Sequence, residues 1–267
     1  MDPITTVGAG LAILGSKDIL NKILGPTADY IGSEAKGLVE KCNINLNNVL
    51  SRAKEKLGPR LEDDGAVSPR VLRHVFEDGR FADEEIVVEY YGGLLAGSKS
   101  ESGKDDQALP YLAKVQQMSA HQLRLHFIFY YELLRIHKNS GTNLGLGTDW
   151  PKLALIIPHE LFLQVLPAKD AAQKYWKIMS HAVVGLSQDG LLSSYAYGEI
   201  PERTKNFPGA PSNAIYLAPS FLGAELFMWA LGIDSPSGHD FFNIELDTIQ
   251  KVIPIQGSAF SKLKNAG

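Results

Sequence analysis

The residues that come closest to a known chemical motif are 92–100, with the sequence GGLLAGSKS. A P-loop needs a glycine, four residues and then Gly-Lys-Ser/Thr after a buried strand, so that backbone amides and the lysine hold the phosphates. Here Ser98 separates Gly97 from Lys99, and the preceding residues have helical periodicity. The lysine follows a helix C-terminus, whose partial negative charge disfavours phosphate. We therefore expect no nucleotide site, and we expect Lys99 and Ser100 to begin a solvated loop.

The glycines in this stretch have a structural explanation. Two glycines inside a helix cost on the order of 2 kcal/mol relative to alanine, so close packing must offset that loss. Their spacing aligns Gly92 with Ala96 and Gly93 with Gly97 along one side of the helix. The resulting smooth strip lets a neighbouring backbone approach closely. These four positions are predicted to be helix-packing residues.

Histidine and serine motifs do not complete a catalytic or metal-binding set. His121 and His126 are five residues apart, about 140° around a helix, whereas two helical ligands of one metal are usually four apart. GLSQDG at 185–190 misses the Gly-x-Ser-x-Gly motif by one residue. SGHD at 237–240 places its polar residues in sequence, but catalytic triads are normally assembled by the fold. We expect no catalytic residue, no metal, no cofactor and no small-molecule substrate.

The first half of the sequence has mainly helical periodicity, so helices are predicted to position these residues. Ser119 and Gln122 have the spacing of a capping box, in which each side chain satisfies the other's backbone amide. The helix that they begin, through His137, is apolar on most sides and belongs inside a domain. Another amphipathic helix is predicted from Asp170 to about Gly185.

The order of elements changes after residue 141. The helix from Asp170 is followed by a strand at 191–197, a turn-rich excursion, a strand at 213–217 and a helix from Phe221. This order is the one found around the wing of a winged-helix domain. We expect a mainly α fold with a C-terminal winged-helix-like α+β module. The expected domains are a helical N-terminal segment at 1–60, a helical core domain at 66–140 and the winged-helix-like domain at 141–267.

Composition limits the choice of partners and compartment. A net charge of -4 and a pI near 6.0 argue against a protein whose main role is to wrap nucleic acid. Cys42 is the single cysteine, so the sequence contains no internal disulfide and no cysteine-built metal site. We expect a cytoplasmic protein.

Nucleic-acid binding by the winged-helix-like module would depend on four basic residues. Lys174 and Lys177 lie on the predicted recognition helix, and Arg203 and Lys205 lie in the predicted wing. A helix that reads DNA usually offers arginines or several amides to the base edges, whereas this helix offers only Gln173. We therefore expect contacts with a protein rather than with DNA.

The apolar segment at 4–24 is interrupted by charged residues and has no basic start, so neither a signal peptide nor a spanning helix is predicted. Its apolar residues form one helical face opposite Lys17 and Lys22. We expect this face to dock on the protein or on a second copy, with a peripheral contact to the inner membrane as the alternative. The face comprises Leu11, Leu14, Ile19, Leu20, Ile23 and Leu24.

Several stretches resemble the bacterial Abi-alpha (abortive infection alpha) family. They are LGPTADYIG at 24–32, VSPRVLRHVFEDGRFADEEIVVEYYGGLLAGS at 67–98, LPYLAKVQQMSAHQLRLH at 109–126, and the later GLLSSYAY and IYLAPSFLGAELF. Together they cover most of residues 24–231. The chain departs from the family pattern at Ala218, where threonine is expected, and at Gly92 and Gly93, where larger residues are expected.

The resemblance implies a role in defence against phage and supplies no catalytic residue. A ribonuclease of the HEPN type needs an arginine and a histidine separated by four to six residues, but three separate Arg70 from His74. The expected function is non-enzymatic anti-phage defence through contacts with a protein partner, a second copy or the membrane surface. The alternatives are a winged-helix nucleic-acid-binding regulator and a nuclease effector with an unrecognised motif.

Overall fold

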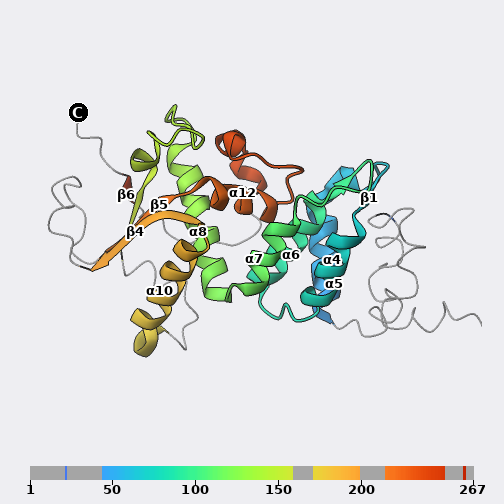
Figure 1. Ribbon diagram of the computed structural model, residues 1–267, viewed down its shortest axis with the longest axis horizontal. Coiled ribbons are helices and arrows are strands. Elements are labelled where there is room, and N and C mark those ends of the chain that lie inside the picture. The colour runs from blue at the N-terminus through green and yellow to red at the C-terminus, as the bar shows by residue number, and fades with distance from the viewer. Residues whose placement is uncertain (1–21, 23–43, 159–170, 199–213, 250–260, 263–267) are drawn as a thin grey trace, which may run out of the picture. The chain divides into compact units, whose positions relative to one another are not determined.

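The computed structural model describes Lys22 and residues 44–158, 171–198, 214–249 and 261–262 (Figure 1). This part of the chain is mainly helical with two small antiparallel sheets, which confirms the expected fold class at that level. The chain forms two compact units. One consists of residues 1–117 and 228–236, and the other of residues 118–227 and 237–267.

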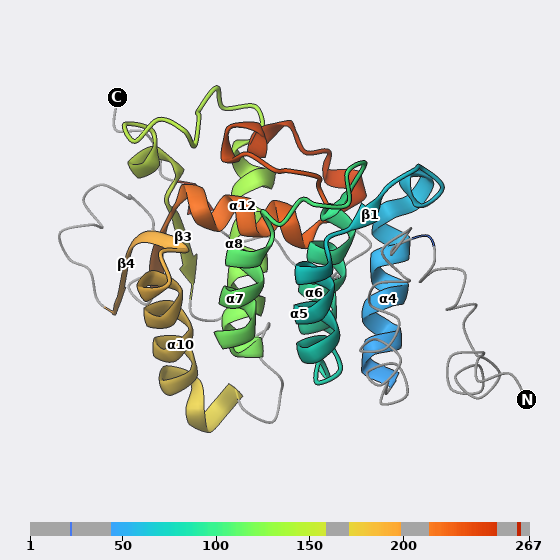
Figure 2. The ribbon, with the colours of Figure 1, turned by 45° about the vertical axis from the view of Figure 1, so that its right-hand side comes forward.

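The first unit is built around helix α6, which contacts α4, α5 and α7. In Figure 2, α4 lies to one side of the overlapping α5 and α6. Helix α6 is buried along almost its whole length because neighbouring segments cover it on several sides. The helices are α4 (Ile44–Leu57), α5 (Pro69–Gly79), α6 (Glu85–Gly97) and α7 (Leu109–Gln117), and the 3-10 helix η2 (Gly58–Leu61) follows α4. Strand β1 (Ala66–Val67) pairs antiparallel with β2 (Lys99–Ser100).

The second unit combines helices with an antiparallel sheet in the order β4-β5-β3-β6. Its helices are α8 (Ala120–His137), α10 (Ala171–Gln188) and the start of α12 (Phe221–Ala230), with 3-10 helices η3 (Trp150–Leu153), η4 (Gly238–Asn243) and η5 (Leu246–Thr248). Its strands are β3 (Leu155–Pro158), β4 (Leu192–Gly198), β5 (Ala214–Pro219) and β6 (Ser261–Lys262). Leu155 pairs with Leu217, and Tyr195 pairs with Leu217 from the other side, so β5 lies in the middle.

The predicted start of α8 is confirmed. The side chain of Ser119 accepts a hydrogen bond from the amide of Gln122, and the Gln122 side chain accepts one from the amide of Ser119. The helix then runs to His137, as the apolar pattern predicts.

The two units do not follow the domain boundaries expected at 60–66 and 140–141. Helix α8, assigned from the sequence to the core domain at 66–140, belongs to the second unit. Its aromatic residues explain this, because Phe127 packs on Phe227 with ring centroids 5.1 Å apart and Tyr130 packs on Phe241 at 5.9 Å. Such partners are distant in sequence, and helical periodicity does not reveal them.

A buried polar cluster joins α8 to the start of α12. The Tyr130 hydroxyl donates to the backbone oxygen of Leu191 at 2.7 Å and accepts from the amide of Ser220 at 2.9 Å. His126 Nε2 donates to the backbone oxygen of Gly223 at 3.0 Å. Because the imidazole is fully buried, desolvation lowers the pKa of His126 to about 3, and the ring is neutral at physiological pH.

Candidate functional site

The small-residue strip on α6 lies where other backbones come closest. A Cβ atom added at Gly93 would lie 2.1 Å from the backbone oxygen of Ala230, and one at Gly97 would lie 2.6 Å from that of Ile233. On the α4 side, a Cβ at Gly92 would lie 2.8 Å from the Cβ of Arg52. Backbone atoms cannot move aside as the end of a flexible side chain can, so larger residues would not fit at these positions. The small residues therefore allow α6 to pack closely on its neighbours and do not face a ligand.

Lys99 corrects the expectation of a solvated loop. Its side chain is only 5% exposed, and its ammonium group donates to the backbone oxygens of Arg60, Leu61 and Asp63 at 2.9, 3.0 and 2.7 Å. These carbonyls lie at and just after the end of η2, where helical carbonyls lack intrahelical partners. Burial lowers the pKa of Lys99, opposed by the charge of Asp63. The lysine therefore ties β2 to the end of η2 and binds no phosphate.

A buried carboxylate joins α6 to α4 in the first unit. Glu89 is 0% exposed and forms ion pairs with Arg52 and with Lys56, the latter at 2.8 Å. Burial lowers the pKa of Lys56, and the neighbouring Glu89 opposes that effect. Arg52 also contacts the exposed Glu55 at 2.6 Å.

A hollow of about 370 Å³ opens beside this ion-pair network. It is lined by Asn48, Ser51, Arg52, Glu55, Ala82, Asp83, Glu85 and Val88. Arg52 is already shared among Glu55, Glu85 and Glu89. We therefore interpret these ion pairs as structural contacts that hold α4 against α6.

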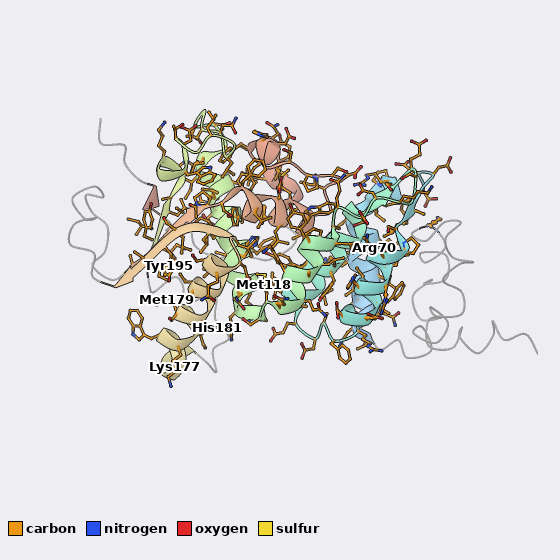
Figure 3. The ribbon with its side chains drawn as sticks, viewed as in Figure 1. Arg70, Met118, Lys177, Met179, His181 and Tyr195 are labelled. Carbon is orange, nitrogen blue, oxygen red and sulfur yellow. The ribbon has the colours of Figure 1, made fainter. Side chains whose placement is uncertain are left out.

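Helix α10 of the second unit has a buried apolar side and an exposed side with residues that could bind a partner. Met179, Ala182, Val183 and Leu186 are buried, as expected of an amphipathic helix. Its outer residues include Trp176, which is 51% exposed, and the exposed Lys177 and His181. Figure 3 shows Lys177 and His181 along this helix. An exposed tryptophan offers a large apolar area together with a hydrogen-bond donor.

Some of the residues predicted from the sequence lie outside the described part. They are the side chain of Lys174, Arg203 and Lys205 of the predicted wing, and the apolar face formed by Leu11, Leu14, Ile19, Leu20, Ile23 and Leu24. In the portion of the chain that the structure covers, no helix has the length and apolar character needed to cross a bilayer. Within the same portion, no three histidine, cysteine, aspartate or glutamate side chains are grouped as metal ligands.

One contact at the start of α8 was not predicted. Ser119 Oγ lies 3.0 Å from His181 Nε2 of α10. The two residues are 62 positions apart, so a search for adjacent motifs could not pair them. The capping box identified Ser119 as a helix cap, and nothing in the sequence indicated its second partner.

Comparison of the chain with protein-family models, with curated proteins and with solved structures gives no match.

Proposed function

We propose that this chain is a bacterial anti-phage defence protein of the abortive-infection type, and that its second unit is a winged-helix-like module that binds a protein partner through α10. The resemblance of residues 24–231 to the Abi-alpha family supports the biological role. The exposed Trp176 on α10 carries the binding role.

The order and pairing of the elements support a winged-helix-like module. The elements of the second unit occur along the chain in the order α8, η3, β3, α10, β4 and β5. Strand β5 pairs antiparallel with both β3 and β4. In the proposed module, the wing would be the segment of the sequence between β4 and β5, and the recognition helix would be α10, which directly precedes β4.

The exposed side of α10 suits a protein partner better than DNA. Tryptophan is enriched among the residues that dominate protein interfaces, where its loss often costs more than about 2 kcal/mol of binding energy. Among the side chains that the structure describes on this helix, Lys177 is the only lysine or arginine. Base readout and phosphate neutralisation usually require several such groups.

Two comparisons of phage plating test the proposal. Cells that carry the gene should plate at least one phage of a broad panel at least tenfold less efficiently than cells without it. The Trp176→Ala variant should lose most of this protection while its circular dichroism and melting temperature stay unchanged. The matched control is Lys104→Ala, at an exposed lysine of the first unit. If no phage were restricted, the defence role would be wrong; if Trp176→Ala protected fully, the role of α10 would be wrong.

The alternative is a winged-helix nucleic-acid-binding regulator, which the exposed Lys177 favours. Fluorescence anisotropy with a labelled duplex at low salt separates the two functions. Binding that weakens steeply with added salt and disappears when Lys174 and Lys177 are both changed to glutamate would establish the alternative. Salt-independent or absent binding would leave the protein partner as the interpretation of this surface.

A further inference from the structure

We propose that Ser119 is a nucleophile activated by His181, and that the second unit carries an acyl-transfer site for small esters with an anionic group. This activity goes beyond the contact role and departs from the non-enzymatic function expected from the sequence. Its test uses purified protein, so its outcome is independent of any protection from phage.

The two side chains have the geometry of a nucleophile and its base. Ser119 Oγ lies 3.0 Å from His181 Nε2, within hydrogen-bond reach. The amide of Gln122 donates to Ser119 Oγ at 3.3 Å and occupies one of its lone pairs. The hydroxyl proton can therefore point to Nε2 when the imidazole is neutral and protonated at Nδ1.

Packing between α8 and α10 holds the pair together. Gln122, three residues after Ser119, is buried, and a Cβ added at Gly185 would lie 2.1 Å from Gln122 Nε2. Gly185 follows His181 by one helical turn. Gln122 and Gly185 therefore pack together about one helical turn from Ser119 and His181. This packing fixes the positions of the serine and the histidine in the absence of substrate.

The environment of the serine suits the charge that develops during acyl transfer. Ser119 is the N-cap of the 18-residue helix α8, whose N-terminus carries partial positive charge. This charge stabilises an oxyanion formed next to the serine. Lys177 precedes His181 by four residues on α10, a spacing that places two side chains on the same side of a helix. A cation in this position favours a substrate with a carboxylate or phosphate group near the ester.

The reaction proceeds in two balanced steps. Ser119 Oγ attacks the ester carbonyl carbon and forms an O–C bond while His181 Nε2 takes the hydroxyl proton. The C–O bond to the alcohol then breaks, and the imidazolium returns the proton to the leaving alcohol. Water attacks the acyl-serine with His181 again as the base, the acid is released, and Ser119 regains its proton.

The two roles of Ser119 can be separated by substitution. Asparagine caps helices about as well as serine but has no hydroxyl nucleophile. Ser119→Asn should therefore keep the fold and abolish the chemistry. His181→Gln removes the base at an exposed position. The matched controls are Ser193→Asn, at an exposed serine of β4, and His74→Gln, at an exposed histidine of α5.

The full chain is first treated with a fluorophosphonate, in which Oγ displaces fluoride from phosphorus. Mass spectrometry should find one adduct, on Ser119. Ser119→Asn should not react, and His181→Gln should react at least a hundredfold more slowly. Both controls should react as the wild type does. An unlabelled wild type, an adduct on another residue, or equal reaction of Ser119→Asn would overturn the proposal.

The substrate class is tested with two activated esters, 4-nitrophenyl acetate and 4-nitrophenyl hemisuccinate. After correction for spontaneous hydrolysis, the hemisuccinate should have the higher kcat/KM because it carries a carboxylate. Lys177→Ala should lower kcat/KM for the hemisuccinate and bring the ratio of the two kcat/KM values close to one. Equal kcat/KM values for the two esters in the wild type would overturn the assigned substrate class.

Discussion

The Nζ atom of Lys99 lies 2.7 Å from the backbone oxygen of Asp63. The same ammonium group reaches the backbone oxygens of Arg60 and Leu61, so one buried cation satisfies three carbonyls at the end of η2. Strand β2 contains Lys99 and pairs with β1, and β1 begins only a few residues after η2. A residue that resembles the lysine of a P-loop thus has a structural role in this fold.

Changing Lys99 to methionine should destabilise the protein by about 2 to 4 kcal/mol, because buried carbonyls lose a charged donor while the apolar stem is retained. The free energy of unfolding in urea measures this loss. Lys104→Met is the control at an exposed lysine, and it should change stability by less than about 0.5 kcal/mol. Equal effects of the two substitutions would contradict the role given to Lys99.

Gly93→Ala should destabilise the first unit by at least about 2 kcal/mol, because the new methyl group would collide with the backbone oxygen of Ala230. Thermal unfolding followed by circular dichroism measures the effect. Gly79→Ala is the matched control, since its Cβ would meet Val49 Cγ2 at an ordinary 3.5 Å. Stability of the control should be unchanged or slightly higher. A Gly93→Ala protein as stable as the control would show that α6 can shift away from this segment.

Glu89→Gln should cost about 3 to 5 kcal/mol, because it leaves Arg52 and Lys56 without the buried carboxylate that pairs with both. Glu55→Gln, at a side chain that is 63% exposed, removes another partner of Arg52 and should cost less than about 1 kcal/mol. Chemical denaturation of the two variants compares them directly. The buried ion pairs would not be structural if both losses were small.

Stability should fall in acid partly because of His126. The pKa of this residue is about 3 in the folded protein and 6.5 when unperturbed, so between these values the unfolded chain binds a proton that the folded protein excludes. Stability therefore decreases as the pH falls through this window, by up to about 1.4 kcal/mol per pH unit from this group, and is unaffected by it above pH 6.5. NMR titration should find the His126 ring neutral at pH 5. A ring that titrates near pH 6.5 would contradict its complete burial.

Elements determined by neighbouring residues could be predicted from the sequence. The capping box at Ser119 and Gln122 was correct because both partners lie within one helical turn, and the strands at 191–197 and 213–217 correspond to β4 and β5 within one or two residues. On α10, the apolar residues Met179 and Val183 are buried as the periodicity predicts, whereas the apolar Trp176 is 51% exposed. Each of these signals is local.

Features that depend on distant partners could not be predicted. Lys99 follows a helix end in the sequence, and only its pairing with β1 brings it to the carbonyls of η2. Ser119 and His181 meet because α8 packs on α10, which helical periodicity does not specify. The assignment of α8 to the second unit has the same cause.

The first unit is discontinuous in the chain: residues 228–236 complete a core otherwise formed within the first 117. Trp229 from that segment packs on Tyr111 with ring centroids 5.9 Å apart, and Ala230 closes over Gly93. During synthesis from the N-terminus, the ribosome must therefore produce residues 118–227, which are most of the second unit, before the first unit can finish folding. Until residues 228–236 have been made, the apolar surface of the first unit that this segment covers stays exposed. During that interval the surface is accessible to chaperones.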